Sequence, residues 1–178
     1  MFSDETERPS ALRYVRYLYA MNPTLTTDLK LVPIGRTEAD NERFTQHPDC
    51  QDSLDQTLAL YQRVGYEPPW IGYYAEEAGT LVGMAGYVGP PEDGRVEIAY
   101  GTFPQHQQRG IGTEICRQLV RLALRTDPSV TVIAHTLPEE NFSTQILRKN
   151  GFAQTGTAHD PDEGEVWEWT YQPPTPVL

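Results

Sequence analysis

The stretch that decides the fold is Gln107-Gln108-Arg109-Gly110-Ile111-Gly112-Thr113. It follows a β-rich run and opens a helical pattern, so successive backbone N–H groups of a tight turn would converge where the helix dipole is positive. Gly110 and Gly112 would let the backbone approach phosphate oxygens with no Cβ in the way, and Arg109 would add charge. A strand, two glycines and a helix also occur at an ordinary structural turn. The flanking sequence is therefore needed to distinguish a phosphate-binding loop from such a turn.

Strands and helices alternate on the C-terminal side of this stretch. The pattern predicts a helix from about residue 112 to 125, which Asp127-Pro128 ends. Beyond it we expect a buried strand, a short helix and two closing strands, over residues 129–137, 141–150, 152–157 and 165–171. An acidic turn, residues 160–164, joins the last two strands.

The N-terminal side predicts an antiparallel meander. An opening strand, a helix and three further strands are expected at residues 28–34, 52–64, 70–76, 80–88 and 95–103. Short turns separate the last three strands, and the turn at residues 90–94 is rich in proline and glycine. Residues 10–21 carry many tyrosines and arginines and fit a helix or a strand equally well.

Length and composition predict one globular unit. We expect a single domain over residues 1–178, with an N-terminal extension at 1–27 and a frayed tail at 172–178. Mean hydropathy is -0.54, and no apolar run approaches the ~20 residues of a membrane span, so no membrane partner is expected. The N-terminus lacks the pattern of a secretory signal, which predicts a cytoplasmic protein. Cys50 and Cys116 show no C-x-x-C spacing, so neither a disulfide framework nor a metal site is expected.

Charge is unevenly distributed along the chain. The 14 basic and 25 acidic residues give a net charge of -11, which argues against nucleic-acid binding and favours cationic partners. Residues 107–150 hold six basic and four acidic residues, a net of +2, so the remainder carries -13. Three of the basic residues, Arg117, Arg121 and Arg125, also fit an ordinary solvated helix face.

Three segments in the same order resemble the GNAT superfamily of N-acetyltransferases, in its RimJ/RimL-like branch. The Q-x-x-G-x-G pattern at residues 107–112 is similar to the acetyl-coenzyme A pyrophosphate loop of the superfamily. Residues 96–100 resemble the E-I-x-Y strand of the branch, and residues 135–143 with 149–152 resemble its closing strand and helix. The resemblance implies an α/β (α+β) GNAT fold, with a mixed, mostly antiparallel central sheet of about seven strands and helices on both faces. A splayed parallel pair of strands would form the acetyl-coenzyme A cleft.

The resemblance also implies which residues hold acetyl-coenzyme A, the expected co-substrate. Its pyrophosphate would meet the backbone of the loop, and its pantetheine would pair like an extra strand with the preceding strand, with a further contact from the following helix. The residues so implied are Gly101, Thr102, Phe103, Gln107, Gln108, Arg109, Gly110, Ile111, Gly112, Thr113 and Asn141. No metal is required.

Amide formation needs a base, because an alkyl ammonium with a pKa of ~10.4 is almost wholly protonated at neutral pH. Glu97 matches the glutamate of the family and is the first candidate, although a strand glutamate is often only solvated or paired. His135 is the rival base, with a structural histidine as the alternative. Leu147 stands where many members carry a general-acid tyrosine. Ser143 has two interpretations: its hydroxyl donates a hydrogen bond near the thioester sulfur of acetyl-coenzyme A, or the residue only caps its helix.

The acceptor is expected to be a primary amine, either a small cationic amine or a protein N-terminus. Trp70, Tyr87 and Tyr100 on the meander are candidates for contacting it, although strand aromatics are often core residues. Two functions are kept open: an N-acetyltransferase that works by direct attack in a ternary complex, and a non-catalytic coenzyme A-binding sensor or regulatory module. A homodimer, the commonest soluble assembly, is also considered.

Overall fold

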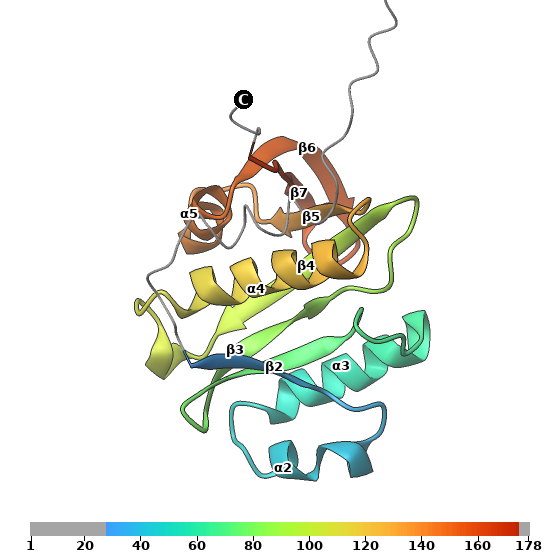
Figure 1. The fold of residues 1–178 in the computed structure, drawn as a ribbon, viewed down its shortest axis with the longest axis vertical. Coiled ribbons are helices and arrows are strands. Elements are labelled where there is room, and N and C mark those ends of the chain that lie inside the picture. Colours follow the sequence, from blue (N-terminus) through green and yellow to red (C-terminus); the bar gives the residue numbers. More distant parts are fainter. Residues whose placement is uncertain (1–27, 175–178) are drawn as a thin grey trace, which may run out of the picture.

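A seven-stranded sheet runs through residues 28–174, the part of the chain that the computed structural model describes (Figure 1). The strands are β1 (Leu29–Pro33), β2 (Gly72–Glu77), β3 (Thr80–Tyr87), β4 (Arg95–Thr102), β5 (Thr131–Thr136), β6 (Phe152–Asp160) and β7 (Gly164–Tyr171). The helical segments are η1 (Glu38–Asn41), α2 (Glu42–Thr45), α3 (Gln51–Val64), η2 (Pro104–His106), α4 (Ile111–Thr126) and α5 (Phe142–Lys149). Across the sheet the order is β1-β2-β3-β4-β5-β7-β6, so β7 lies between β5 and β6.

Every strand and each of the three long helices expected from the sequence is present, with ends that agree to within three residues. The sequence did not predict η1, α2 or η2, because segments of three or four residues are too short to show a helical period. Residues 10–21, for which helix and strand were both considered, lie outside the described residues. Within residues 28–174, no helix has the length and apolar character that a membrane crossing requires.

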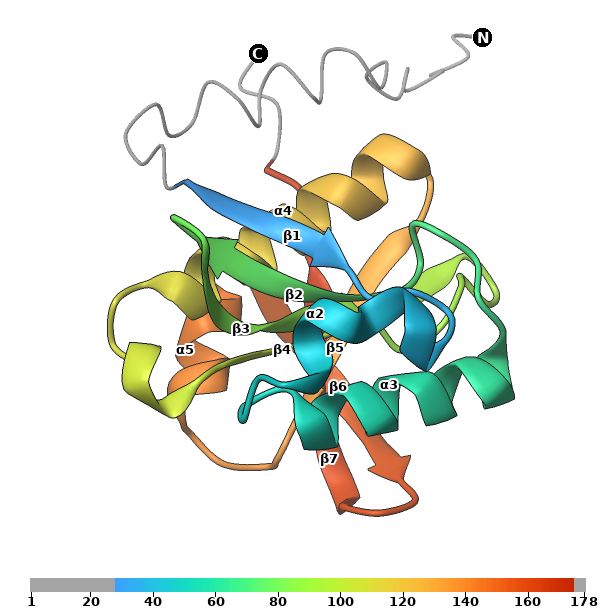
Figure 2. The ribbon, with the colours of Figure 1, turned by 90° about the horizontal axis from the view of Figure 1, so that it is seen from below.

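Helices α4 and α3 lie on opposite faces of the sheet (Figure 2). On one face, the Tyr87 hydroxyl of β3 donates a hydrogen bond to the Leu119 carbonyl of α4 at 2.7 Å. On the other face, the Tyr74 hydroxyl of β2 is 3.0 Å from the Ser53 hydroxyl of α3. Because successive side chains of a strand point to opposite faces, each strand contributes residues to both layers of the core.

The structure places Trp70 and Tyr87 in the core rather than at an acceptor site. Their side chains are buried, and their rings pack edge to face with centroids 5.1 Å apart. The hydroxyl of Tyr87 is also used in the bond to α4, and burial raises its pKa far above the usual range. The three strands of the meander were predicted correctly, but the sequence does not show which face α4 covers.

The parallel pair of strands separates, as expected for the GNAT fold. β4 and β5 are paired only from Arg95 with Thr131 to Glu97 with Ile133. Beyond Glu97, β4 remains paired with β3 on its other side, from Ile98 to Thr102. The β4 edge that faces β5 therefore has no strand partner along its last five residues.

Candidate active site

The loop before α4 turns sharply through two left-handed residues. Gln108 has a φ of 61° and Gly110 a φ of 79°, and α4 begins at Ile111. Glycine adopts this conformation without the steric cost that a Cβ adds. The first hydrogen bond of the helix joins the Glu114 N–H to the Gly110 carbonyl at 3.1 Å. The N–H groups that precede it have no intrahelical acceptor, which makes this helix end suited to an anion.

Gly112 has an ordinary backbone conformation and packs closely against two side chains. A Cβ at this position would lie 2.9 Å from Ile146 Cδ1 of α5 and 3.2 Å from Thr102 Oγ1 of β4. The Asn150 side chain, at the end of α5, donates to the Thr113 carbonyl at 3.2 Å. The loop, the end of β4 and α5 are therefore held close together around the start of α4.

A pocket of about 590 Å³ lies at this junction. Its lining comes from the end of β4, from the loop and first turn of α4, and from one side of α5. The lining residues are Tyr100, Gly101, Thr102, His106, Gln107, Gln108, Gly110, Ile111, Gly112, Thr113, Phe142, Ser143, Gln145, Ile146 and Lys149. Most of the residues expected to hold acetyl-coenzyme A are among them.

Sequence reasoning missed the residues that α5 contributes to this pocket. Phe142, Gln145, Ile146 and Lys149 are spaced at i, i+3, i+4 and i+7, which is the spacing of one helix face. Ser143, which was predicted, lies on the same side at the first turn. Helical spacing from Ser143 points to Ile146, at i+3, but not to Phe142, Gln145 or Lys149, so the assignment of Ser143 alone does not identify this face of the helix.

Arg109 does not line the pocket. Its guanidinium forms an ion pair with Glu77 of β2 at 2.7 Å and lies 3.2 Å from Nδ1 of His106. Two other basic residues of the +2 segment are similarly engaged, since Arg117 pairs with Glu114 and Arg148 pairs with Glu140. Of the six basic residues in that segment, Lys149 is the one whose side chain borders this pocket. The charge segregation seen in the sequence therefore does not correspond to a ring of cations around the loop.

The backbone of β4 presents alternate residues to the open edge. The Glu97 carbonyl accepts from Val88, and the Phe103 N–H donates to Val82, so both point toward β3. Because the backbone groups of successive strand residues point to opposite edges, Tyr100 and Thr102 face the opening. The backbone groups of Gly101 and Phe103 are directed at β3, although Gly101 borders the pocket, and the Phe103 side chain is buried in the core.

Asn141 acts as the N-cap of α5. Its Oδ1 accepts from the Thr144 N–H at 3.1 Å, and the Thr144 hydroxyl in turn lies 3.2 Å from the Asn141 N–H. The side-chain oxygen of Asn141 is thus engaged by the cap, and the residue, which was expected to contact pantetheine, does not border the pocket. The cap instead fixes the start of α5, from which Phe142 and Ser143 reach the pocket.

The two candidate bases contact each other at the point where β4 and β5 separate. Glu97 Oε1 lies 3.0 Å from Nδ1 of His135. Nε2 of the same imidazole is 3.6 Å from Glu168 Oε2 on β7, and the other oxygen of Glu168 is 2.8 Å from Arg95. We call these four residues, Arg95, Glu97, His135 and Glu168, the ionic cluster. Sequence reasoning missed Arg95 and Glu168.

Glu168 titrates under two opposing influences. Burial acts to raise the pKa of its carboxyl, but the hydrogen bond and charge of Arg95, reinforced by His135, hold that pKa below its usual range. The cluster therefore keeps Glu168 ionised, because its negative charge is matched by a neighbouring guanidinium.

Two further residues limit where a general acid can be found. Leu147 is buried, so the position that often carries an acid tyrosine contributes only to the core. The Tyr100 side chain borders the pocket, but its hydroxyl is buried and has no hydrogen-bond partner among residues 28–174. Burial raises the pKa of this hydroxyl far above its usual range, and neighbouring Cys116 adds to the rise. Ser143, exposed at the start of α5, is the remaining candidate from the sequence.

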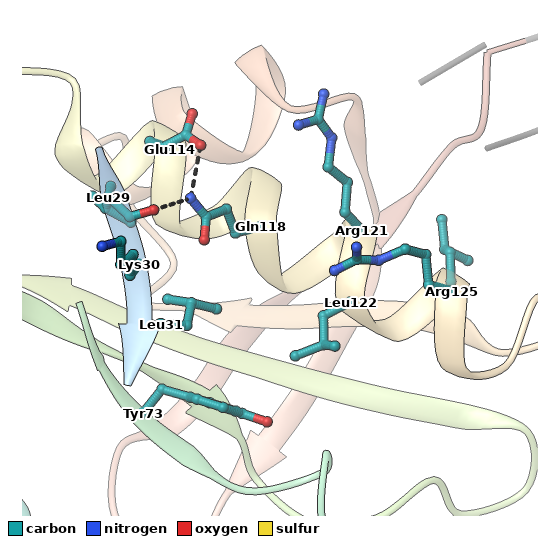
Figure 3. A pocket seen from close by; sticks show the side chains of 10 residues that line it. Leu29, Lys30, Leu31, Tyr73, Glu114, Gln118, Arg121, Leu122 and Arg125 are labelled. Carbon is teal, nitrogen blue, oxygen red and sulfur yellow. Dashed lines mark hydrogen bonds between the residues drawn. The ribbon is translucent and has the colours of Figure 1, made fainter. Parts of the chain in front are cut away.

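A second pocket, of about 520 Å³, lies between β1 and α4 and extends along the helix from Glu114 to Arg125 (Figure 3). Gln118 donates to the Leu29 carbonyl at 2.9 Å and to Glu114 at 3.0 Å, which ties β1 to α4. Arg121 and Arg125 border this pocket. It includes neither the glycine loop nor any member of the ionic cluster, so its place in the fold separates it from the candidate site.

Comparison with known proteins agrees with this geometry. The acetyltransferase (GNAT) domain family matches residues 22–153, which is well over half of the chain. A search of curated proteins returned no match. Among solved structures, spermidine/spermine N-acetyltransferase SpeG from Vibrio cholerae is 15% identical, with a TM-score of 0.59, and covers 80% of this chain and 91% of its own.

Two further structures share the fold. RimL, a ribosomal L7/L12 alpha-N-protein acetyltransferase solved in complex with coenzyme A, is 16% identical, with a TM-score of 0.57 and coverage of 83% of this chain and 95% of its own. A GnaT-family acetyltransferase from Bordetella pertussis is 21% identical, with a TM-score of 0.56 and coverage of 83% and 98%. At these identities the structures establish the fold alone, whereas the family match extends through β4, the loop, α4 and α5. The chain therefore belongs to the acetyltransferase (GNAT) domain family and is an acyltransferase.

Proposed function

We propose that this chain transfers an acetyl group from acetyl-coenzyme A to a primary amine, by direct attack in a ternary complex, within a single acetyltransferase domain. The observation that carries the proposal is the separated parallel pair. Beyond Glu97 the edge of β4 is unpaired, and it leads to the pocket bordered by the first residues of α4. The ionic cluster lies at the other end of that edge, where the two strands part.

The residues of the pocket fit acetyl-coenzyme A. The volume of about 590 Å³ is that of a small-molecule site. The N–H groups at the start of α4 suit a pyrophosphate, and Lys149 adds a positive charge beside them. The backbone groups of Tyr100 and Thr102 suit the amides of a pantetheine arm. When bound, acetyl-coenzyme A supplies the thioester from which the acetyl group is taken.

Glu97 removes the proton that keeps the acceptor amine from attacking. An alkyl ammonium holds its proton at neutral pH, and a carboxylate beside it both attracts the cation and accepts the proton as the new bond forms. His135 contacts the same carboxylate at 3.0 Å, so it takes part through Glu97 rather than as a separate rival. The two alternatives left open by the sequence thus become two members of one pair.

Ser143 is the candidate hydrogen-bond donor at the other end of the reaction. Ser143 borders the pocket at the first turn of α5. The N-cap of α5 is Asn141, so the capping role that was considered for Ser143 belongs to Asn141. Its hydroxyl can orient a water or donate to a departing thiolate. Leu147 is buried and offers no such group.

The acceptor is proposed to be a cationic primary amine. Acidic residues dominate the chain outside residues 107–150, with a net charge of -13, and the turn between β6 and β7 is rich in them. The names of SpeG and RimL specify a polyamine and a protein N-terminus, and both acceptors offer a primary amine. A cytoplasmic location and a homodimer remain expectations, and sedimentation of the purified protein tests the second.

Two measurements test the proposed function. Acetyl-coenzyme A at about 100 times its dissociation constant should add ~2.7 kcal/mol to the free energy of unfolding, which thermal denaturation detects. Incubation with acetyl-coenzyme A and a panel of amines should then release free thiol in proportion to a new amide identified by mass spectrometry. No thermal shift at millimolar ligand would contradict binding.

The absence of a tyrosine at position 147 supports one other candidate, a domain that binds coenzyme A without turning it over. In that case the thermal shift is present, but no amine of the panel produces thiol. Including polyamines, amino sugars, amino acids and peptides with free N-termini makes that outcome informative.

A further inference from the structure

Phe142 is the most exposed large apolar residue within residues 28–174. It is 70% exposed, whereas Leu137, Val64 and Val88 are 42%, 40% and 38% exposed. An exposed apolar side chain that stands alone needs no explanation. Phe142 differs from the other three in its position, because it lines the pocket between β4, the loop and α5, and they do not.

The cap of α5 and the packing of its next turn fix where Phe142 lies. Asn141 caps the helix, so Phe142 is the first helical residue. Ile146, one turn further along, lies against the loop, since a Cβ at Gly112 would be 2.9 Å from Ile146 Cδ1. Phe142 is therefore one helical turn away, along the axis of α5, from the point where the helix meets the loop.

The other two aromatic residues of the pocket lining are less available to a ligand. The hydroxyl of Tyr100 is buried, and the residue as a whole is half-buried. His106 is also half-buried, and its Nδ1 lies 3.2 Å from the guanidinium of Arg109. Phe142 thus offers the pocket its most accessible flat apolar surface.

Acetyl-coenzyme A has one part for which no partner has been assigned. The N–H groups at the start of α4 suit its pyrophosphate, and the backbone of Tyr100 and Thr102 suits the amides of its pantetheine arm. Its adenine is a flat, uncharged ring with two π faces, and an aromatic side chain stacks on such a face. The pantetheine arm is an extended chain that has no flat ring to match.

We propose that Phe142 stacks on the adenine ring of acetyl-coenzyme A, and so makes the protein select a thioester that carries a nucleotide over the same thioester without one. This inference rests on the proposed function. It assigns Phe142 a contact with the part of the donor that is remote from the reacting atoms, so the residue contributes to binding and not to proton transfer.

The order of groups on this face of α5 agrees with a nucleotide. Ile146 lies at the loop, where the pyrophosphate is proposed to bind, with Phe142 one turn to one side and Lys149 nearly one turn to the other. Adenine is joined to the pyrophosphate by a single ribose. A base that stacks on Phe142 therefore needs no long extension away from the loop, and Lys149 adds a positive charge beside the phosphates.

The test divides acetyl-coenzyme A into its two halves. Adenosine bisphosphate carries the adenine without the pantetheine arm, and acetyl-phosphopantetheine carries the arm and the thioester without the adenosine. Titration calorimetry measures the binding of each. Phe142→Ala should weaken the binding of acetyl-coenzyme A and of adenosine bisphosphate about tenfold, the loss expected for one stacked base. The binding of acetyl-phosphopantetheine should be unchanged.

Two further substitutions at this position separate stacking from apolar contact. Phe142→Trp keeps a flat ring, so it should retain the affinity for acetyl-coenzyme A, and adenosine bisphosphate should quench the added indole fluorescence. Phe142→Leu keeps apolar bulk without a ring, so it should lose most of the affinity that Phe142→Ala loses. Each variant should fold, because the side chain is mainly exposed and leucine and alanine favour a helix.

Leu137→Ala is the matched control. Leu137 is an exposed apolar residue shortly before α5 that does not line the pocket, so its loss should leave the binding of all three ligands unchanged. Equal binding of acetyl-coenzyme A by the wild type and Phe142→Ala would overturn the inference. So would a matching loss for acetyl-phosphopantetheine, or full affinity in Phe142→Leu. A wild type that binds acetyl-coenzyme A but acetylates no amine would contradict the proposed transfer alone, because every result here is read from binding.

Discussion

The loop before α4 and the ionic cluster are built from different parts of the chain. The loop uses consecutive backbone groups of residues 107–113, and its first four residues are exposed. The ionic cluster uses side chains from β4, β5 and β7, which are brought together by strand pairing alone. A site made of backbone tolerates side-chain changes and is sensitive to main-chain conformation, whereas a side-chain cluster has the opposite sensitivities. The two regions can therefore be disabled separately.

The largest expected effect comes from Glu97→Gln in the ionic cluster. Losing the carboxylate that accepts the amine proton should reduce turnover by roughly 10²–10⁴-fold, the range typical of a general base. The stabilisation by acetyl-coenzyme A should be unchanged, because the loop is intact. Thiol release measures the turnover, and thermal denaturation of the same preparation measures the stabilisation by acetyl-coenzyme A. Turnover within threefold of the wild type would mean that Glu97 is only a structural partner of His135.

The reciprocal change is Gly110→Ala in the loop. Alanine at a φ of 79° should cost roughly 1–2 kcal/mol in the free energy of unfolding and should shrink the stabilisation by acetyl-coenzyme A. Gly94→Ala is the matched control: its φ is 73°, and neither glycine has an atom near its Cβ position. Urea denaturation with and without ligand should show similar losses of stability in both variants and a loss of ligand response only at position 110. Equal ligand responses would contradict a role for the loop backbone in binding.

The same contrast explains what the sequence could predict. The loop was predicted because its signal is local: a strand, two glycines and a helix occur within twenty residues of one another. The contact between Glu97 and His135 required only that their strands pair in parallel. Glu168 was missed because β7 inserts between β5 and β6, and no local pattern in residues 164–171 specifies that order.

Errors in the candidate site have similar physical causes. Arg109 was assigned to the phosphates by sequence proximity, but Glu77 on β2 is near enough to pair with it. Tyr87 lies on the face that α4 covers and Trp70 packs against its ring, and the strand pattern does not show which face a helix will cover. Phe103 was placed on the open edge, although its N–H is directed at β3. In each case a residue far away in the sequence decides the role.

A smaller effect separates two cations near the loop. Lys149→Gln should weaken acetyl-coenzyme A binding about two- to fivefold, because the Lys149 side chain borders the pocket and acts as an exposed charge. Arg109→Gln should change binding less, because Arg109 is engaged with Glu77. Titration calorimetry at two salt concentrations measures both, and the loss from Lys149→Gln should shrink at high salt. The reverse ranking would mean that Arg109 leaves Glu77 to contact the ligand.

The smallest expected effect concerns acid stability and the ionic cluster. Arg95 holds the pKa of Glu168 below its usual value of 4.5 in the folded state, against the opposing influence of burial. A depressed pKa stabilises the fold fully above about pH 4.5, and this contribution is lost as the pH falls through the folded-state pKa.

Glu168→Gln removes that contribution, so the free energy of unfolding should fall less steeply with acidification in the variant than in the wild type. For a partly exposed pair the difference should not exceed about 1 kcal/mol. Urea denaturation between about pH 6 and pH 3 measures it, with Glu165→Gln as an exposed glutamate on the same strand for comparison. Parallel pH dependences in all three proteins would mean that the Arg95 pair adds nothing to acid stability.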